Sequence, residues 1–156
     1  MKLSFLTSAL VLALVTAAAA HDFKVGALVI DHPWSRATPK GAAVAGGYMK
    51  ITNTGTTPDR LTGGTTDSAK KFEIHEMKME GSVMRMRELT DGIVIPPGAT
   101  VELKPGSYHI MMTTLARPFA KGDFVKASLI FEKAGKVDIE FAVDAAGGGG
   151  AKEHKH

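Results

Sequence analysis

The sequence predicts an all-β protein, built as a β-sandwich or a small barrel. Two segments near the C-terminus, residues 125–132 and 137–143, alternate apolar and polar side chains with a period of two, as half-buried strands do. Shorter apolar stretches upstream are separated by turn signals rich in glycine and proline. No segment after residue 20 has a convincing helical pattern. About eight short strands with regular turns are typical of a sandwich or barrel.

The first twenty residues have the composition of a secretory signal peptide. Lys2 supplies the positive region, residues 3–15 the apolar region and residues 17–20 the small cleavage-site residues. The apolar run is too short for a comfortable membrane span, although an uncleaved anchor is the alternative. Cleavage after Ala19 or after Ala20 satisfies the Ala-x-Ala pattern equally well. We therefore expect an exported protein with no membrane span in its mature chain.

The mature chain is expected to form one domain, residues 21–144, followed by a flexible tail, residues 145–156. The tail begins with two alanines and four glycines, a composition that forms no packed core. In chain order, the candidate strands are Ala27–Asp31, Tyr48–Asn53, Phe72–Lys78, Val83–Leu89, Thr100–Lys104, Tyr108–Thr113, Val125–Glu132 and Val137–Val143. The turn signals between them are Pro39-Lys40-Gly41, Asn53-Thr54-Gly55, Glu80-Gly81, Pro96-Pro97-Gly98, Pro105-Gly106 and Lys133-Ala134-Gly135-Lys136.

Composition argues against several classes of function. The formal net charge is only +3, basic and acidic residues are interspersed, and aromatic residues are few, so nucleic acid is not an expected partner. The chain has no cysteine, and a blue-copper electron-transfer site requires a cysteine thiolate. No GxSxG, P-loop or HExxH pattern is present, and no carboxylate pair is marked out for acid–base work. We expect a protein that is not an enzyme.

Methionine and histidine are clustered in one part of the chain. Six of the seven methionines after Met1 lie between Met77 and Met112, and His75 and His109 lie in the same region. A thioether sulfur is a soft ligand and an imidazole suits copper, so this set favours Cu(I) over hard ions such as Mg²⁺ and Ca²⁺. Methionine spread through a core would only fill space. The clustering therefore predicts a copper site.

Residues 72–89 predict a hairpin that carries part of this site. His75 and Met77 share one face of its first strand. A two-residue loop at Glu80-Gly81 would place His75 opposite Met86 and Met77 opposite Met84, with Cβ atoms about 5 Å apart. A three-residue loop would shift this register by one residue. Under the first register, His75 and Met86 could hold one ion between them.

The His109-Ile110-Met111-Met112 run predicts the other part. Residues two apart in a strand point to the same side, so His109 and Met111 project together. Ile110 and Met112 point to the opposite face, which makes Met112, like Met49, a candidate for the hydrophobic core.

These residues resemble the signature of the periplasmic copper chaperones called PCu(A)C. The signature consists of His75-Glu76-Met77, a methionine eleven positions after His75, and a His-x-Met twenty-three positions after that methionine. The resemblance covers roughly residues 22–143. The segments that carry it are His32–Pro39, Glu73–Met79, Val83–Arg87 and Leu103–Met111. It implies a cupredoxin-like Greek-key β-barrel that binds one Cu(I) through His75, Met86, His109 and Met111.

The resemblance also implies a function and partners. The protein would be a periplasmic metallochaperone that delivers Cu(I) toward the Cu(A) centre of cytochrome c oxidase, alongside a Sco-type thiol protein. Independently of the resemblance, we expect a monomer. A copper-buffering or resistance protein without a dedicated acceptor would have the same site. A metal-free β-sandwich interaction module with coincidental methionines is the third possibility, and the absence of bound copper would reveal it.

Several residues outside the four have two interpretations. Met77, Met79 and Met84 could shield the ion or accept it during transfer, or could pack against a neighbouring loop. Trp34 could cover the site or serve as a buried anchor. His154 and His156 in the tail could bind Cu(II) or remain solvated. His21, if cleavage left it at the amino terminus, could chelate Cu(II) through its amine and imidazole.

Overall fold

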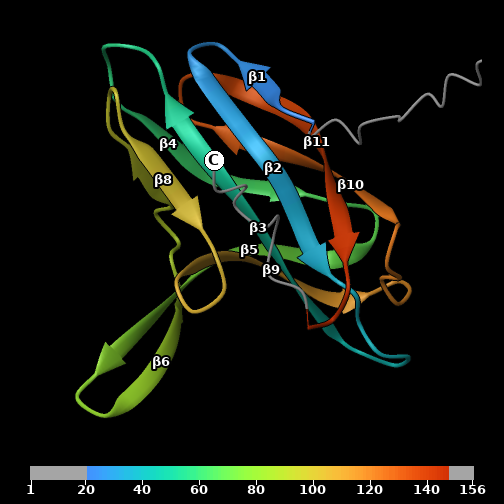
Figure 1. Ribbon diagram of the computed structural model, residues 1–156. Coiled ribbons are helices and arrows are strands. Elements are labelled where there is room, and N and C mark those ends of the chain that lie inside the picture. Colours follow the sequence, from blue (N-terminus) through green and yellow to red (C-terminus); the bar gives the residue numbers. More distant parts are fainter. Residues whose placement is uncertain (1–20, 148–156) are drawn as a thin grey trace, which may run out of the picture.

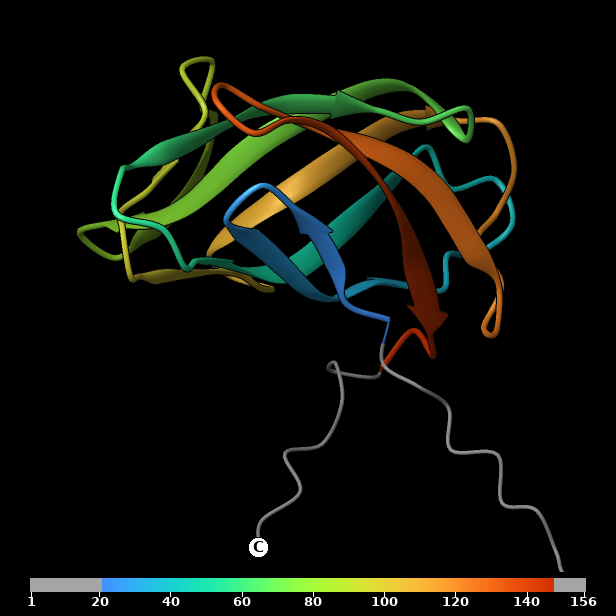
Figure 2. The same ribbon diagram turned by 90° about the horizontal axis from the view of Figure 1, so that it is seen from above.

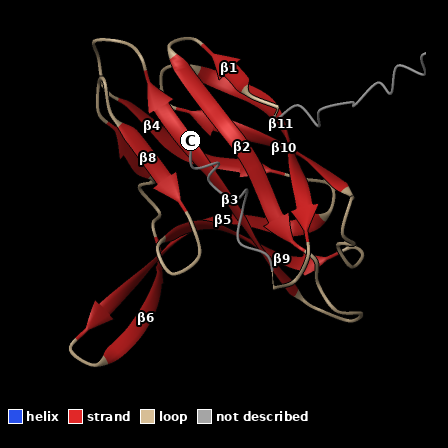
Figure 3. Ribbon diagram, in the orientation of Figure 1, coloured by secondary structure: helices blue, strands red, loops and turns tan. Residues whose placement is uncertain are grey.

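The computed structural model describes residues 21–147, and all regular structure in this range is β-strand (Figures 1 and 3). The all-β prediction is confirmed. The described part of the chain has no helix of the length and apolarity needed to cross a membrane. The expected signal peptide and the tail histidines, His154 and His156, lie outside the described residues. The strands are β1 (Phe23–Val25), β2 (Leu28–Arg36), β3 (Val44–Asn53), β4 (Asp59–Thr65), β5 (Ala69–Glu80), β6 (Val83–Glu88), β7 (Ile93–Ile95), β8 (Thr100–Leu103), β9 (Tyr108–Leu115), β10 (Phe124–Phe131) and β11 (Gly135–Asp144).

The strands form one sheet that curls on itself, as Figure 2 shows. Its order is β6-β5-β9-β3-β2-β11-β10-β4-β7, with β1 paired to β2 and β8 paired to β3. All pairs are antiparallel except β11 with β2, where Ala142 lies beside Trp34. The curl brings β5 close to β4. At this point the Phe72 ring lies against Gly64, which has no Cβ to obstruct the contact. The β5–β6 hairpin extends away from this body (Figure 1).

Each predicted strand overlaps an observed one, but three short strands were not predicted. β4 begins with Asp59 and contains Gly63-Gly64, residue types that lower its β-propensity. β1 and β7 have only three residues each, too few for a periodic pattern. β2 continues past Pro33 because a bulge between Asp31 and Trp34 removes the need for a hydrogen-bonding N–H there.

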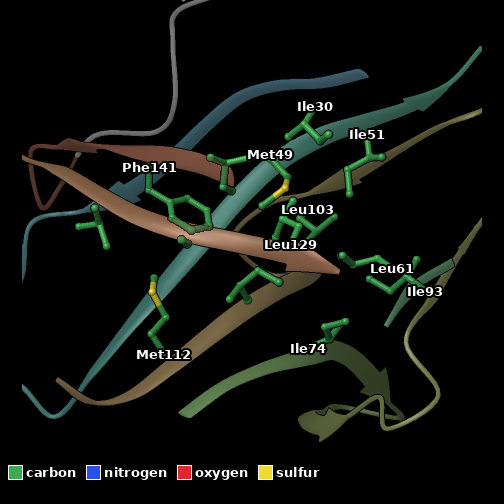
Figure 4. Close-up of a cluster of buried hydrophobic side chains, with 14 of the residues drawn as sticks. Ile30, Met49, Ile51, Leu61, Ile74, Ile93, Leu103, Met112, Leu129 and Phe141 are labelled. Atoms are coloured by element: carbon green, nitrogen blue, oxygen red, sulfur yellow. The ribbon is translucent and has the colours of Figure 1, made fainter. Parts of the chain in front are cut away.

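The inward-facing side chains form one hydrophobic core (Figure 4). β10 follows the predicted alternation, with Val125, Leu129 and Phe131 buried and their neighbours more exposed. Met49 and Met112 are 2% and 0% exposed, so their prediction as core residues is confirmed. The core therefore occupies one face of β3, β5 and β9 and leaves the other face of these strands available for a site.

Asp59 is a buried carboxylate that joins β4 to the turn between β10 and β11. Its Oδ1 accepts hydrogen bonds from the backbone N–H groups of Arg60 (2.7 Å) and Lys133 (2.9 Å), and its Oδ2 accepts one from Ala134 (2.9 Å). Burial acts to raise the pKa of Asp59, but these three donors together hold it below its ordinary value of 3.8.

We expect Asp59→Asn to lower the free energy of unfolding at pH 7 by about 1–3 kcal/mol, because the amide cannot accept all three bonds. A depressed carboxyl pKa stabilises the fold above the unfolded-state pKa, and this contribution is lost as the pH falls through the folded-state pKa. The difference between wild type and variant should therefore shrink below pH 3.8. Urea denaturation across this range measures it, with the exposed Asp67→Asn as control. A difference that does not change with pH would contradict the account.

Candidate metal centre

Two imidazoles meet on the outer face of the sheet. His75 of β5 and His109 of β9 are directly paired across the strands, and their ring centroids are 5.6 Å apart with a tilt of 49°. Ile74 and Ile110, one residue away on each strand, are 3% and 0% exposed and belong to the core. Because side chains alternate along a strand, the paired histidines lie on the face opposite the core.

Each histidine has one ring nitrogen fixed by a hydrogen bond. His75 Nε2–H donates to Glu73 Oε2 over 2.9 Å, and His109 Nδ1–H donates to the Ser107 carbonyl over 3.1 Å. These bonds select the tautomers that leave His75 Nδ1 and His109 Nε2 with free lone pairs. Metal-binding histidines usually donate their other N–H to a carboxylate or a backbone carbonyl, and both partner types occur here.

The free nitrogen of His75 provides a test of whether a metal ion fits. Its Nδ1 is buried and has no hydrogen-bond partner. A buried nitrogen without a partner is unfavourable by about 1–3 kcal/mol, and coordination to a soft ion would remove this penalty. Among the described side chains only one other nitrogen is in this state, His32 Nε2, in the β2 bulge where φ is +46°.

The electrostatics of His109 favour the form that binds metal. Burial lowers the pKa of His109, and the nearby His75 lowers it further, while the bond to Ser107 acts in the opposite direction. The net pKa lies below the ordinary 6.5. The imidazole is therefore neutral at neutral pH, as coordination requires.

Met111 lies in the next row of the same face. Its partners across the strands are Glu73 on β5 and Gly46 on β3. A Cβ at Gly46 would overlap the Tyr48 hydroxyl, so the glycine lets the phenol ring lie across this position. The Trp34 ring contacts Tyr48 with centroids 4.6 Å apart and a tilt of 40°, and Trp34 is 7% exposed. Trp34 is thus a buried anchor, and Tyr48 is the aromatic residue that reaches the position opposite Met111.

Met86 is not opposite His75, and the predicted register of the β5–β6 hairpin is wrong. The structure pairs His75 with Glu88 and Met77 with Met86. The loop consists of residues 81–82 instead of 80–81, with Gly81 at φ +64° in the first loop position, where type II′ turns place glycine. The shift is two residues, so every side chain keeps its predicted face. Met86 moves about 7 Å along the strand and becomes a diagonal neighbour of His75.

The structure therefore brings three of the four predicted ligands together on two neighbouring strands, His75, His109 and Met111. Met86 stands on the same face of the adjoining hairpin and is 50% exposed. The sequence interpretation missed Glu73 and Ser107, which fix the two imidazoles. Both precede their histidine by two residues, and this spacing in a strand could have indicated them.

Comparison with known proteins identifies the family. Residues 28–143 match the family model LpqE-like, described as "Putative lipoprotein LpqE-like". The copper-bound PCuAC domain from PmoF2 is 32% identical, with a TM-score of 0.68 over 80% of this chain and 98% of that domain. The chain belongs to the PCuAC family. Its predicted family membership and cupredoxin-like β fold are both confirmed.

Other known proteins share the family or the fold. The apo PCuAC domain from PmoF1 is 30% identical, with a TM-score of 0.69 over 80% of this PCuAC chain and 99% of that domain. Apo-DR1885 from Deinococcus radiodurans, at 20% identity and a TM-score of 0.60 over 93% and 97% of the two chains, shares the fold. A curated protein of Leifsonia xyli subsp. xyli, "Putative lipoprotein Lxx21020", is 31% identical over 102 residues. That match spans 65% of this chain and 60% of the relative's length.

Proposed function

We propose that this PCuAC protein is a periplasmic metallochaperone that binds one Cu(I) through His75, Met86, His109 and Met111. The observation that carries the proposal is the histidine pair. Its rings are adjacent, the second nitrogen of each is already held, and His75 Nδ1 is buried without a partner. The copper bound by the PmoF2 domain supports copper as the cargo.

The ligand chemistry favours a carrier over a catalyst. Two imidazoles and two thioethers are all neutral, so they hold Cu(I) without thiolate charge and can release it to an acceptor rich in thiolates. Four protein ligands fill the coordination sphere and leave no open position for a substrate. Met86 is the exposed ligand and His109 the buried one, so an acceptor thiolate displaces Met86 first and the imidazoles last.

The proposed acceptor is the Cu(A) centre of cytochrome c oxidase, with a Sco-type thiol protein as a second partner. The expected signal peptide and the lipoprotein relative support an exported location. We propose that residues 21–144 form the copper-binding domain and that the protein acts as a monomer. Cu(II) binding by His154 and His156 or by His21 is a separate proposal for the ends of the chain.

Measuring the transfer of Cu(I) to an acceptor protein tests the proposed chaperone function. Residues 21–156 loaded with Cu(I) would be mixed anaerobically with a soluble Cu(A) domain and, separately, with a reduced Sco-type protein. Copper in each partner is measured after chromatographic separation. We expect transfer by the wild type and its loss in Met86→Ala and in Met111→Ala, with Val83→Ala on the same hairpin as control. Full transfer by both methionine variants would refute the mechanism.

A gene deletion distinguishes delivery of copper to an acceptor from buffering of copper in the cell. Deletion of the gene should reduce cytochrome c oxidase activity if the protein supplies the Cu(A) centre. Copper sensitivity with unchanged oxidase activity would instead identify a buffering protein with the same site.

A further inference from the structure

The β5–β6 hairpin carries more thioethers than the four-ligand site uses. Met77 pairs with Met86 and Met79 pairs with Met84, so two consecutive cross-strand pairs occupy one face of the hairpin. We call these four residues the methionine ladder. Its inner pair is the row next to His75, and its outer pair lies about 7 Å further along the hairpin. The hairpin extends away from the barrel (Figure 1), so the ladder leads from the histidine pair toward solvent.

Three of the four ladder residues are exposed, and Met77 is half-buried. Met79, Met84 and Met86 are 52%, 46% and 50% exposed. About half of each of these side chains is open to solvent, which argues against the packing interpretation of Met79 and Met84. All six residues of β6 are exposed, and β6 ends the sheet. A row of exposed large apolar side chains on an edge strand promotes aggregation. Such a row in a native protein therefore usually marks a binding site.

The opposite face of the hairpin is charged and internally paired. Arg87 contacts Glu76 at 2.7 Å, and Arg85 contacts Glu80 at 2.8 Å. These pairs draw both carboxylates away from the ladder, because alternate residues of a strand face opposite sides. The outer end of the ladder therefore offers soft sulfur ligands without a hard oxygen ligand beside them.

The strand pairing lets Met79, Met84 and the adjacent Met77 form a three-thioether site. Met79 and Met84 are directly opposed, which places their Cβ atoms about 5 Å apart. Met77 is the neighbour of Met79 on the same face and lies diagonally from Met84, within reach of a long side chain. Methionine has three rotatable bonds, so the three sulfurs can converge on one ion. Thioethers select Cu(I), and the soft ion Ag(I) with the same d¹⁰ configuration, over hard cations.

We propose that Met77, Met79 and Met84 form a second, weaker Cu(I) site at the outer end of the ladder. The ion enters there and passes inward by thioether exchange, through Met77 and Met86, to the histidine pair. Each exchange along the ladder replaces one Cu–S bond by another, and arrival at the histidine pair replaces a Cu–S bond by a Cu–N bond to an imidazole. The charge and oxidation state of Cu(I) are unchanged throughout. The site shares no residue with the four-ligand site, so substitutions can remove the ligands of either one while keeping those of the other.

The test is an anaerobic Cu(I) titration of the full mature chain against a chromophoric chelator. It is paired with NMR of ¹³C-labelled methionine methyl groups, using Ag(I) as the redox-silent probe. We expect two equivalents of unequal affinity, the weaker of which shifts the methyl signals of Met77, Met79 and Met84. Met79→Leu/Met84→Leu keeps the apolar volume and should remove the weaker equivalent alone. Val83→Ala, exposed on the same hairpin, should keep both.

A second background separates this proposal from the four-ligand site. In His109→Ala/Met111→Leu the tight equivalent is lost, and the weaker one should remain with the same methyl shifts. The tail has no methionine, so ions bound there produce no such shifts. The proposal is overturned if Met79→Leu/Met84→Leu retains the weaker equivalent, or if two equivalents of Ag(I) leave the Met79 and Met84 methyl signals unmoved.

Discussion

His109→Ala is expected to lower the affinity for Cu(I) by more than about 100-fold, since removal of a residue that only supports a ligand already lowers metal affinity about 10- to 100-fold. His109 is 6% exposed, its Nδ1–H is held by Ser107, and its ring centroid lies 5.6 Å from that of His75. No other described imidazole can replace it in this row. Competition with a chromophoric Cu(I) chelator under anaerobic conditions measures the loss.

Glu73→Gln is expected to lower the affinity for Cu(I) less than His109→Ala does. The amide still fills the space but replaces the carboxylate that orients His75, so we expect the smaller loss of about 10- to 100-fold. Glu88→Gln is the matched control, because Glu88 is paired with His75 across the hairpin but is exposed. Equal Cu(I) affinities for the wild type and His109→Ala would show that His109 is not a copper ligand.

The stability of the metal-free protein shows whether His109→Ala acts through the ligand alone. The pKa of His109 is depressed in the fold, so the unfolded chain binds more protons, and the free energy of unfolding falls as the pH drops below 6.5. The variant lacks this group and should lose that part of the pH dependence while remaining folded. Thermal unfolding at pH 7.5 and at pH 5.5 measures both effects.

Gly92→Ala is expected to lower the free energy of unfolding by more than about 3 kcal/mol, beyond the usual range for one substitution. Gly92 follows β6 and leads into β7, with φ at +74°. An added Cβ would overlap the Leu61 carbonyl oxygen and lie 3.1 Å from the Thr62 Cα. Both belong to the backbone of β4, and Leu61 is fully buried, so neither can move without disrupting the β4–β7 pair.

Gly41→Ala is the control for this prediction. Gly41 has φ at +81° but nothing within 4 Å of an added Cβ, so only the conformational penalty of about 1–2 kcal/mol applies. The difference between the two variants in urea denaturation isolates the steric contribution of Leu61 and Thr62. Equal losses would show that β4 yields to the added methyl group.

The face of each site residue could be predicted from the sequence, but the register of the hairpin could not. His109 and Met111 share a face because strand geometry has a period of two, and no competing effect changes this. A glycine can occupy either position of a two-residue loop, and moving Gly81 from the second to the first shifts the pairing by two residues. Such a shift preserves the apolar pattern, so the pattern gives no information about it.

The strands with weak local signals were missed for a related reason. β4 is held by contacts distant in sequence, such as those of Asp59 with residues 133 and 134, and not by its own propensity. The hydrogen bond from His75 to Glu73 follows a spacing visible in the sequence. That Glu73 turns toward His75, although Lys71 lies 3.9 Å away on its other side, depends on the packed structure.

β6 carries two of the proposed thioether ligands on a strand that lies outside the barrel core. β6 pairs only with β5 and contributes no residue to the core, so its sequence is under little constraint from the stability of the barrel. Surface substitutions away from special contacts usually change stability by less than about 0.5 kcal/mol. Substitutions of the methionines in this hairpin, by natural selection or by engineering, can therefore change which soft ion or acceptor the protein prefers. The stability of the barrel should change little.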